Sequence, residues 1–151
     1  MTRRFFVALA LLSLTLVPAA SGALAQDMGM GPLATTQHPT LGSIVTDASG
    51  LTVYTWAGDA AGAGTSACNG QCASAWPPVL VDADMAMGMM DMASAMSTIQ
   101  RDDGSYQVAL NGWPLYRFSG DRAPGDANGD GSNGFGARWS VVSADAMMQG
   151  M

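Results

Sequence analysis

The chain has 151 residues, with 12 acidic side chains against 6 basic ones and a formal net charge of −6 at pH 7. An acidic surface repels nucleic acid and anionic lipid headgroups, so the composition argues against proteins that bind either. Glycine-rich turns between short apolar runs predict an all-β chain, in which 12 methionines are the main anomaly.

The N-terminus has the pattern of an export signal. Two arginines precede an apolar run over residues 5–17, and the tripeptide ALA at 23–25 has the small-x-small form of a cleavage site. The run is shorter than the roughly 20 residues that a spanning helix needs, although a retained anchor is the alternative. We expect residues 1–25 to be a signal peptide, the mature chain to begin at Gln26, and no integral membrane segment to remain. The location would be periplasmic or secreted.

The first part of the mature chain predicts a lead-in followed by a repeat. Residues 26–40 are small, polar and without periodicity, and we expect them to be flexible. The first repeat, residues 41–81, begins with strand-like runs over residues 43–46 and 51–56, joined by the turn sequence DASG. A glycine-rich loop and the run WPPVL, residues 76–80, complete it.

The second part predicts an insertion, another repeat and a tail. Residues 82–97 are rich in methionine, and we expect a short helix or a loop there. In the second repeat, residues 98–143, Asp-Gly and Asn-Gly supply the positive φ angles of tight hairpin turns. These turns separate strand-like runs that predict a meander: residues 98–101, 106–110 and 115–118. Residues 144–151 are expected to be a flexible tail.

One sequence motif occurs twice at a constant offset. LTVYTWAGD begins at Leu51 and WPLYRFSGD at Trp113, so corresponding residues are 62 positions apart (113 − 51). Both copies carry a tyrosine, a second aromatic residue and an aspartate: Tyr54, Trp56 and Asp59, then Tyr116, Phe118 and Asp121. Neither unit has enough apolar surface to be stable alone. We therefore expect two tandem pseudo-repeats of short antiparallel strands that share one core.

Two interpretations of these motif residues are open. Aromatic side chains on strands usually pack, and on that interpretation the four rings are core. Asp59 and Asp121 then accept hydrogen bonds from turn amides. In the alternative, a ligand stacks between the rings.

Cys68 and Cys72 are the only cysteines. In an exported protein such a pair most often forms a disulfide, and Gly70 between them allows a small loop to close. A redox-active dithiol and a soft-metal pair are the alternatives. The sequence contains no CxxCH, so it does not support covalent haem.

Asp126, Asn128 and Asp130 have the D-x-N-x-D-G spacing that opens a calcium-binding loop. The twelfth position is Ala137 rather than glutamate, so the bidentate ligand is missing. The alternative is a turn in which the side chains bond their own backbone. The only histidine, His38, precedes a proline and is expected in a surface loop.

The methionines of the insertion suggest a soft-metal site. Thioethers hold Cu(I), and intervening aspartates raise the local cation concentration. Helical spacing puts Met85, Met89, Met92 and Met96 on one face, where packing against the sheet is the alternative. We predict a Cu(I) site from the sulfurs of the insertion, which Met28, Met30 and His38 would complete: Met85, Met87, Met89, Met90, Met92 and Met96.

Several ordered motifs resemble one known family. YTWAGD and YRFSGD are similar to the Yx(F/W/Y)xxD motif of a bacterial family of secreted repeats, often called predicted lipoproteins. CNGQCASAWPP resembles its CxGxCAxxWPP segment, and PGDANGDG its PGDxxGDG loop. The resemblance covers residues 41–142 and implies export without any settled biochemical role. The chain departs from the pattern in lacking the cysteine for a lipid anchor and in carrying the methionine-rich insertion.

The sequence thus predicts an exported, non-catalytic envelope protein. We expect a binding or interaction module with an unknown envelope partner and with Cu(I) as the leading ligand. A purely structural or adhesion module is the first alternative. A thiol–disulfide oxidoreductase that uses Cys68 and Cys72 is the second.

Overall fold

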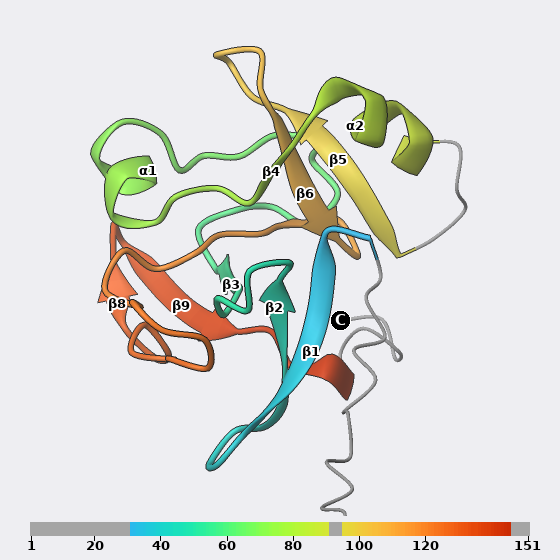
Figure 1. The fold of residues 1–151 in the computed structure, drawn as a ribbon. Coiled ribbons are helices and arrows are strands. Elements are labelled where there is room, and N and C mark those ends of the chain that lie inside the picture. Colours follow the sequence, from blue (N-terminus) through green and yellow to red (C-terminus); the bar gives the residue numbers. More distant parts are fainter. Residues whose placement is uncertain (1–30, 91–94, 146–151) are drawn as a thin grey trace, which may run out of the picture.

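The computed structural model describes residues 31–90 and 95–145, and these residues form an all-β fold with short helices (Figure 1). The expected fold class is confirmed. The elements in chain order are β1 (Leu33–His38), β2 (Gly42–Asp47), β3 (Tyr54–Trp56), α1 (Gln71–Ala75), β4 (Leu80–Val81), α2 (Ala83–Met90), β5 (Met96–Gln100), β6 (Tyr106–Leu110), β7 (Trp113–Pro114), β8 (Asn133–Gly134) and β9 (Ala137–Val141).

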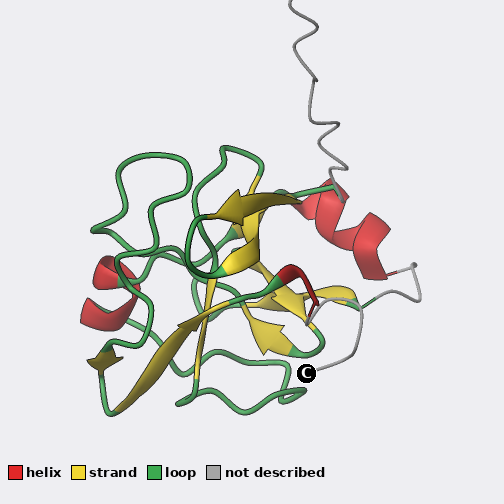
Figure 2. Ribbon diagram, turned by 90° about the horizontal axis from the view of Figure 1, so that it is seen from below, coloured by secondary structure: helices red, strands yellow, loops and turns green. Residues whose placement is uncertain are grey.

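The strands form small antiparallel sheets rather than one large sheet (Figure 2). β1 pairs with β2, β9 lies between β3 and β8, and β6 lies between β4 and β5 and also pairs with β7. The expected meander is thus the β5–β6–β7 unit, in which Gly104 and Gly112 have positive φ angles of 85° and 80° in the turns.

Part of the expected flexible lead-in is a strand. β1 pairs along its whole length with β2, from Leu33 opposite Asp47 to His38 opposite Gly42. Leu33 is fully buried and anchors the strand in the core. The expectation of a flexible segment is therefore wrong for these residues, because pairing with β2 and burial of one leucine order a run that is polar on its own. Residues 26–30 lie outside the described residues.

The two repeats meet at their tyrosines. The amide of Tyr54 donates to the carbonyl of Tyr116 at 2.8 Å, and the amide of Tyr116 donates back to the carbonyl of Tyr54 at 3.0 Å. This reciprocal pair is an isolated antiparallel bridge between the two motif segments. Equivalent residues of the two repeats thus face each other across a local pseudo-twofold axis.

The paired motif segments separate two buried clusters. Side chains alternate along an extended chain, so neighbouring residues point to opposite sides. Val53 and Leu115 enter an aliphatic cluster that also contains Leu33, Val108 and Leu110. The next residue in each repeat, Tyr54 or Tyr116, enters an aromatic cluster with Trp56, Trp76, Trp139 and the two cysteines. Both repeats contribute to both clusters, so neither repeat has a core of its own.

The methionine-rich insertion begins as a helix, but the helix is shorter than its spacing predicts. α2 ends at Met90, and Met96 is the first residue of β5. The prediction that the methionines share one helical face up to Met96 is therefore wrong. Ala86 and Met89 turn toward the sheet and are buried, whereas Met85 is 42% exposed. Met92 and the side chain of Met90 lie outside the described residues.

A glycine in each motif lies beneath the ring of the preceding aromatic residue. A Cβ atom on Gly58 would lie 2.4 Å from the indole of Trp56, and one on Gly120 would lie 2.4 Å from the ring of Phe118. The indole cannot move away freely, because its N–H donates to the carbonyl of Gly134. The motif therefore requires glycine two positions after its second aromatic residue.

We expect Gly58→Ala to destabilise the fold by about 1–3 kcal/mol, because the added methyl group overlaps a packed ring. Gly88→Ala is the matched control, since it lies in α2 and a Cβ atom there would point into open space. That change should stabilise the protein by up to about 1 kcal/mol, because alanine favours the helix. Urea unfolding measures both values, and equal effects of the two substitutions would contradict the steric explanation.

Candidate functional site

Each motif tyrosine bonds the aspartate of the other repeat. The hydroxyl of Tyr54 donates to Oδ2 of Asp121 at 2.6 Å, and the hydroxyl of Tyr116 donates to Oδ2 of Asp59 at 2.5 Å. Both tyrosines are fully buried, and both aspartates are less than a tenth exposed. A buried carboxylate needs hydrogen-bond partners. Here the tyrosine of each repeat supplies a donor to the aspartate of the other repeat. We call these two contacts the crossed Tyr–Asp pairs.

The other oxygen of each aspartate bonds its own loop. Oδ1 of Asp59 accepts the amide of Ala67, and Oδ1 of Asp121 accepts the amide and side-chain nitrogen of Asn128. These hydrogen bonds from loop amides are the ones that the packing interpretation predicts. The hydrogen bonds from the tyrosines are not predicted, because the residues concerned are far apart in the sequence. One carboxylate therefore orders a glycine-rich loop and simultaneously holds the opposite repeat.

Burial raises the pKa of both tyrosines well above the ordinary value. Desolvation is the largest cause for Tyr54 and for Tyr116, because the charged phenolate loses its water. The hydrogen bond to the neighbouring carboxylate raises the pKa of each tyrosine further, since loss of the proton would leave two anionic oxygens side by side. The tyrosines are thus fixed hydrogen-bond donors, which argues against a role in proton transfer near neutral pH.

Four aromatic rings form a continuous stack between the repeats. Trp76 and Trp139 are parallel with centroids 3.8 Å apart, Trp56 lies on Trp139 at 5.5 Å, and Phe118 lies on Trp76 at 4.4 Å. The stack contains the second aromatic residue and the later tryptophan of each repeat. These direct ring contacts leave no space between the stacked rings for a ligand, so they argue against the ligand-stacking interpretation.

Cys68 and Cys72 form a disulfide, with their Cα atoms 5.2 Å apart. Cys68 is fully buried and Cys72 is 6% exposed. The bond closes the turn before α1 and packs in the aromatic cluster. An exchange reaction requires a thiolate to approach one of the two sulfurs, and the surrounding side chains restrict that approach.

Arg101 holds the disulfide loop against the second repeat. It is 9% exposed, and its guanidinium donates to the carbonyl of Cys68 at 2.7 Å and to the side-chain oxygen of Asn69 at 2.8 Å. It also donates to Gln107 at 2.6 Å and to Ser66 at 3.1 Å. The Ser66 hydroxyl lies 2.6 Å from the Tyr116 hydroxyl, so this arginine joins the network around one crossed Tyr–Asp pair.

The two aspartates with calcium-loop spacing accept backbone amides, and the side chain of Asn128 donates to Asp121. Oδ2 of Asp126 accepts the amides of Arg122 and Ala123, which lowers the pKa of that carboxyl. Oδ1 of Asp130 accepts the amide of Val141 at 2.9 Å. Within residues 31–90 and 95–145, no three His, Cys, Asp or Glu side chains are grouped to hold a metal ion. These contacts support the turn interpretation of Asp126, Asn128 and Asp130.

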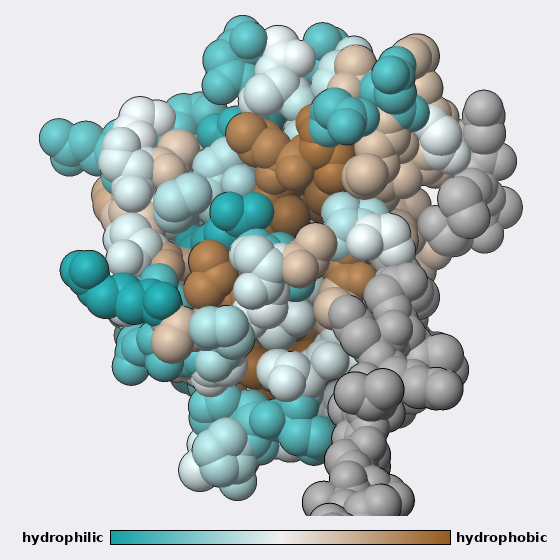
Figure 3. Space-filling view, in the orientation of Figure 1, coloured by the Kyte–Doolittle hydropathy of each residue, from teal (hydrophilic) through white to brown (hydrophobic). Residues whose placement is uncertain are grey.

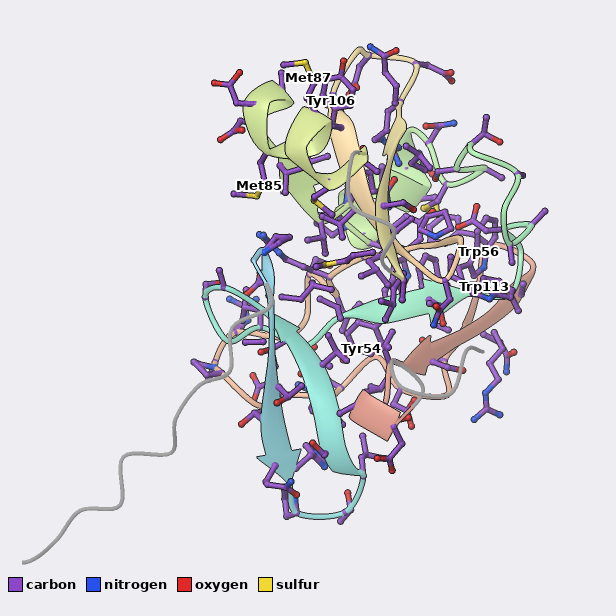
Figure 4. The ribbon with its side chains drawn as sticks, turned by 90° about the vertical axis from the view of Figure 1, so that its right-hand side faces the viewer. Tyr54, Trp56, Met85, Met87, Tyr106 and Trp113 are labelled. Carbon is purple, nitrogen blue, oxygen red and sulfur yellow. A yellow bond between two sulfur atoms is a disulfide. The ribbon has the colours of Figure 1, made fainter. Side chains whose placement is uncertain are left out.

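The thioether sulfurs of the insertion have different environments. Met89 is 7% exposed in the aliphatic cluster, and the partly buried Met96 packs against that cluster. Met85 and Met87 are 42% and 55% exposed, and they leave α2 on different sides (Figure 4). Met28 and Met30 lie outside the described residues. His38, expected in a loop, ends β1, and its Nδ1 accepts the amide of Leu41.

An open groove lies beside the exposed face of α2. Its volume is about 370 Å³, and its walls include Pro32, Val79, Leu80, Val81, Met85 and Arg117. Hydrophobic side chains gather at the surface over β4, between α2 and the upper end of β1 (Figure 3). Nε of Arg117 lies 2.6 Å from Oδ2 of Asp47, and this ion pair forms part of the polar wall together with Ser49 and Asp82. The sequence did not predict this groove, because its residues come from four separate segments.

We expect Tyr54→Phe and Tyr116→Phe each to destabilise the fold by about 1–3 kcal/mol, because each leaves a buried carboxylate oxygen without its donor. Removal of the whole ring in Tyr54→Ala should cost about 3–5 kcal/mol. Tyr106→Phe is the control, since Tyr106 is half-buried outside both clusters and should change stability by less than about 0.5 kcal/mol. Denaturant unfolding measures these changes. If the unfolding midpoints of Tyr54→Phe and Tyr116→Phe equal that of the parent protein, the crossed Tyr–Asp pairs do not stabilise the fold.

The raised tyrosine pKa values predict a loss of stability at alkaline pH. Tyrosines of the unfolded chain ionise near pH 10, whereas Tyr54 and Tyr116 keep their protons in the folded state. The unfolded state then binds fewer protons, so the free energy of unfolding falls as pH rises above about 10. The chain has no lysine, so no lysine side chain ionises in the same pH range as the tyrosines. Denaturant unfolding measured from about pH 8 to 11 should show this fall. The slope of the free energy of unfolding against pH should be roughly halved in Tyr54→Phe or in Tyr116→Phe. If neither substitution changes this slope, the alkaline loss of stability does not come from Tyr54 and Tyr116.

Comparison with known proteins identifies the repeat. A family described as a secreted repeat of unknown function matches residues 35–80 and again residues 97–143. No curated protein and no solved structure is similar enough to be matched. In the part of the chain that the structure describes, no helix is long and apolar enough to cross a membrane. The first match begins inside β1, so that strand belongs to the repeat. The chain is a member of this family of secreted repeats, with one copy on each side of α2.

Proposed function

We propose that this secreted protein is a non-catalytic binding module that presents the groove and the exposed methionines of α2 to a ligand or partner. The observation that carries the proposal is the exposure of Leu80 and Met85 in the wall of the groove, with Met87 exposed on another side of the same helix (Figure 4). Isolated apolar side chains are normal on a surface, but a group of them next to a concave site is typical of binding surfaces. The motif residues themselves are used for packing.

The surroundings of the cysteines argue against an oxidoreductase. Both residues are buried, and Arg101 bonds the carbonyl of Cys68, so opening the loop would disturb the network around Tyr116. Redox-active cysteines are typically partly exposed, beside a group that lowers the thiol pKa.

We therefore expect the folded protein to react with no thiol reagent in the absence of reductant. After denaturation and reduction, two thiols per chain should react. Replacement of both cysteines by alanine should cost about 1–3 kcal/mol, because the disulfide closes only a short loop. Ready exchange of the native disulfide with a small thiol would instead favour the oxidoreductase.

Cu(I) is the ligand that we propose for the methionines. Cu(I) prefers soft sulfur ligands, and thioethers remain available where thiols are paired in disulfides. Met85 and Met87 are the described thioethers with substantial exposure, whereas burial of Met89 supports a packing role for that residue. Asp84 in the first turn of α2 contributes negative charge beside them. Met96 is partly buried against the aliphatic cluster, which also supports packing. Met28, Met30, Met92 and the side chain of Met90 lie outside the described residues.

A Cu(I) titration against a chromogenic competitor tests this proposal. Met85→Leu combined with Met87→Leu removes the two exposed sulfurs and keeps the apolar volume. The matched control combines Met89→Leu with Met96→Leu, which removes two sulfurs from the aliphatic cluster. We expect the first variant to bind Cu(I) at least about tenfold more weakly than the parent protein and the control to bind it nearly as well. Equal retention by all three proteins would exclude a thioether site at the exposed residues.

A structural or adhesion module is the second candidate. It is favoured by the crossed Tyr–Asp pairs and the aromatic stack, which place six motif side chains in one shared core. The two candidates differ in ligand dependence. A binding module gains thermal stability when its ligand is added, whereas a purely structural module does not.

A further inference from the structure

We propose that this protein associates with itself head to tail, with Phe135 of one copy entering the groove beside α2 of the next copy. This inference uses the groove of the proposed binding surface, but it does not depend on Cu(I) binding because it requires no sulfur ligand. It rests on two surface features. The first is an exposed aromatic side chain at the tip of the β8–β9 hairpin. The second is the groove with Leu80 and Met85 in its wall.

Phe135 occupies an unfavourable backbone conformation. The hairpin turns through Phe135 and Gly136, which have φ angles of 58° and 90°. A two-residue turn of this kind favours asparagine or aspartate followed by glycine, and a bulky residue at positive φ is strained. The residue is also 49% exposed, so about half of its surface remains in contact with water within its own copy. Strain and exposure at one residue together point to a role in contact with another molecule.

The rest of the hairpin holds Phe135 in a fixed position. The carbonyl of Gly134, the residue before it, accepts the indole N–H groups of both Trp56 and Trp139 at 3.2 Å. Gly134 also pairs with Ala137 across the turn. The tip is therefore tied to the aromatic stack, and an anchor presented on a fixed tip loses little conformational entropy on binding.

The groove suits an aromatic side chain. Its volume of about 370 Å³ lies toward the lower end of the roughly 300–1,000 Å³ range of small-ligand sites. Leu80 is 46% exposed and Met85 is 42% exposed, so their burial by a ring removes apolar surface from water. Flexible thioethers also make favourable contacts with ring edges.

Charges next to the two features are complementary. Arg138 follows the hairpin turn on β9, is exposed, and forms no salt bridge with any described residue. Asp82 lines the groove, and Asp84 follows it in the first turn of α2, both exposed. In a protein with a net charge of −6, a basic group beside the anchor and acidic groups beside the groove favour this contact over random collisions. This complementarity is why a second copy of the chain is the occupant that we propose.

The two features cannot meet within one copy. β8 lies at one edge of the molecule and α2 at the opposite upper side (Figure 1). A contact between different surfaces of identical chains is heterologous, so each copy has one free tip and one free groove after pairing. Association therefore continues to a closed ring or an open chain instead of stopping at a dimer.

A mixing experiment with two variants tests this arrangement. Phe135→Asn removes the ring and also relieves the turn, because asparagine tolerates positive φ, so its folded state should be at least as stable as that of the parent. Leu80→Asp places a charge in the exposed wall of the groove. By sedimentation, the parent protein should show an average mass that rises with concentration past that of a dimer. Each variant alone should associate at least about tenfold more weakly than the parent.

The mixture gives the decisive result. Phe135→Asn retains an intact groove and Leu80→Asp retains an intact tip, so a 1:1 mixture should form a dimer that stops growing. Leu41→Asp is the control for a charge at an exposed leucine elsewhere, and it should associate like the parent protein. The proposal is overturned if the parent stays monomeric, if Phe135→Asn associates like the parent, or if the mixture contains only monomers. None of these variants removes a sulfur, so this outcome and that of the Cu(I) titration are independent.

Discussion

The crossed Tyr–Asp pairs join the two repeats through buried carboxylates. Each aspartate has one oxygen on a loop of its own repeat and the other on the tyrosine of the opposite repeat. Release of either tyrosine would therefore disturb the loop that its aspartate orders and the bridge between the motif segments together. Because the carboxylates are buried, an oxygen left without a donor is costly, and this cost gives the arrangement its specificity.

The remaining motif residues serve the same junction. The paired backbones of Tyr54 and Tyr116 bring the two repeats within hydrogen-bond distance, and the four-ring stack fills the volume next to them. Gly58 and Gly120 leave room for the rings, and the disulfide and Arg101 hold the loop that approaches Tyr116. The side chains of the repeated motif thus explain the fold of this chain. The ligand and partner contacts that we propose therefore use residues outside the motif, those of α2 and of the β8–β9 tip.

The sequence predicts the fold class well because its signals are local. The Asp-Gly and Asn-Gly turns at Gly104 and Gly112 follow from neighbouring residues, and the repeat can be read directly from its constant offset. β1 was missed because its order comes from pairing with β2 and from burial of Leu33, which are tertiary effects. The groove and the Tyr–Asp partners were missed for the same reason, since 67 positions separate Tyr54 from Asp121. The helical face proposed for the methionines failed because a strand begins at Met96.

The pseudo-twofold arrangement has a consequence for the connection between the repeats. With respect to the crossed pairs, each repeat behaves as one subunit of a dimer, and the chain between them acts as a covalent tether. Such a tether sets the effective concentration of one half for the other, and that concentration changes only slowly with tether length. Insertions at this point are therefore tolerated more readily than insertions within either repeat. Apart from the residues that α2 and β5 place in or against the core, such as Met89 and Met96, the methionine-rich segment lies where the chain is freest to acquire new sequence, and with it new chemistry.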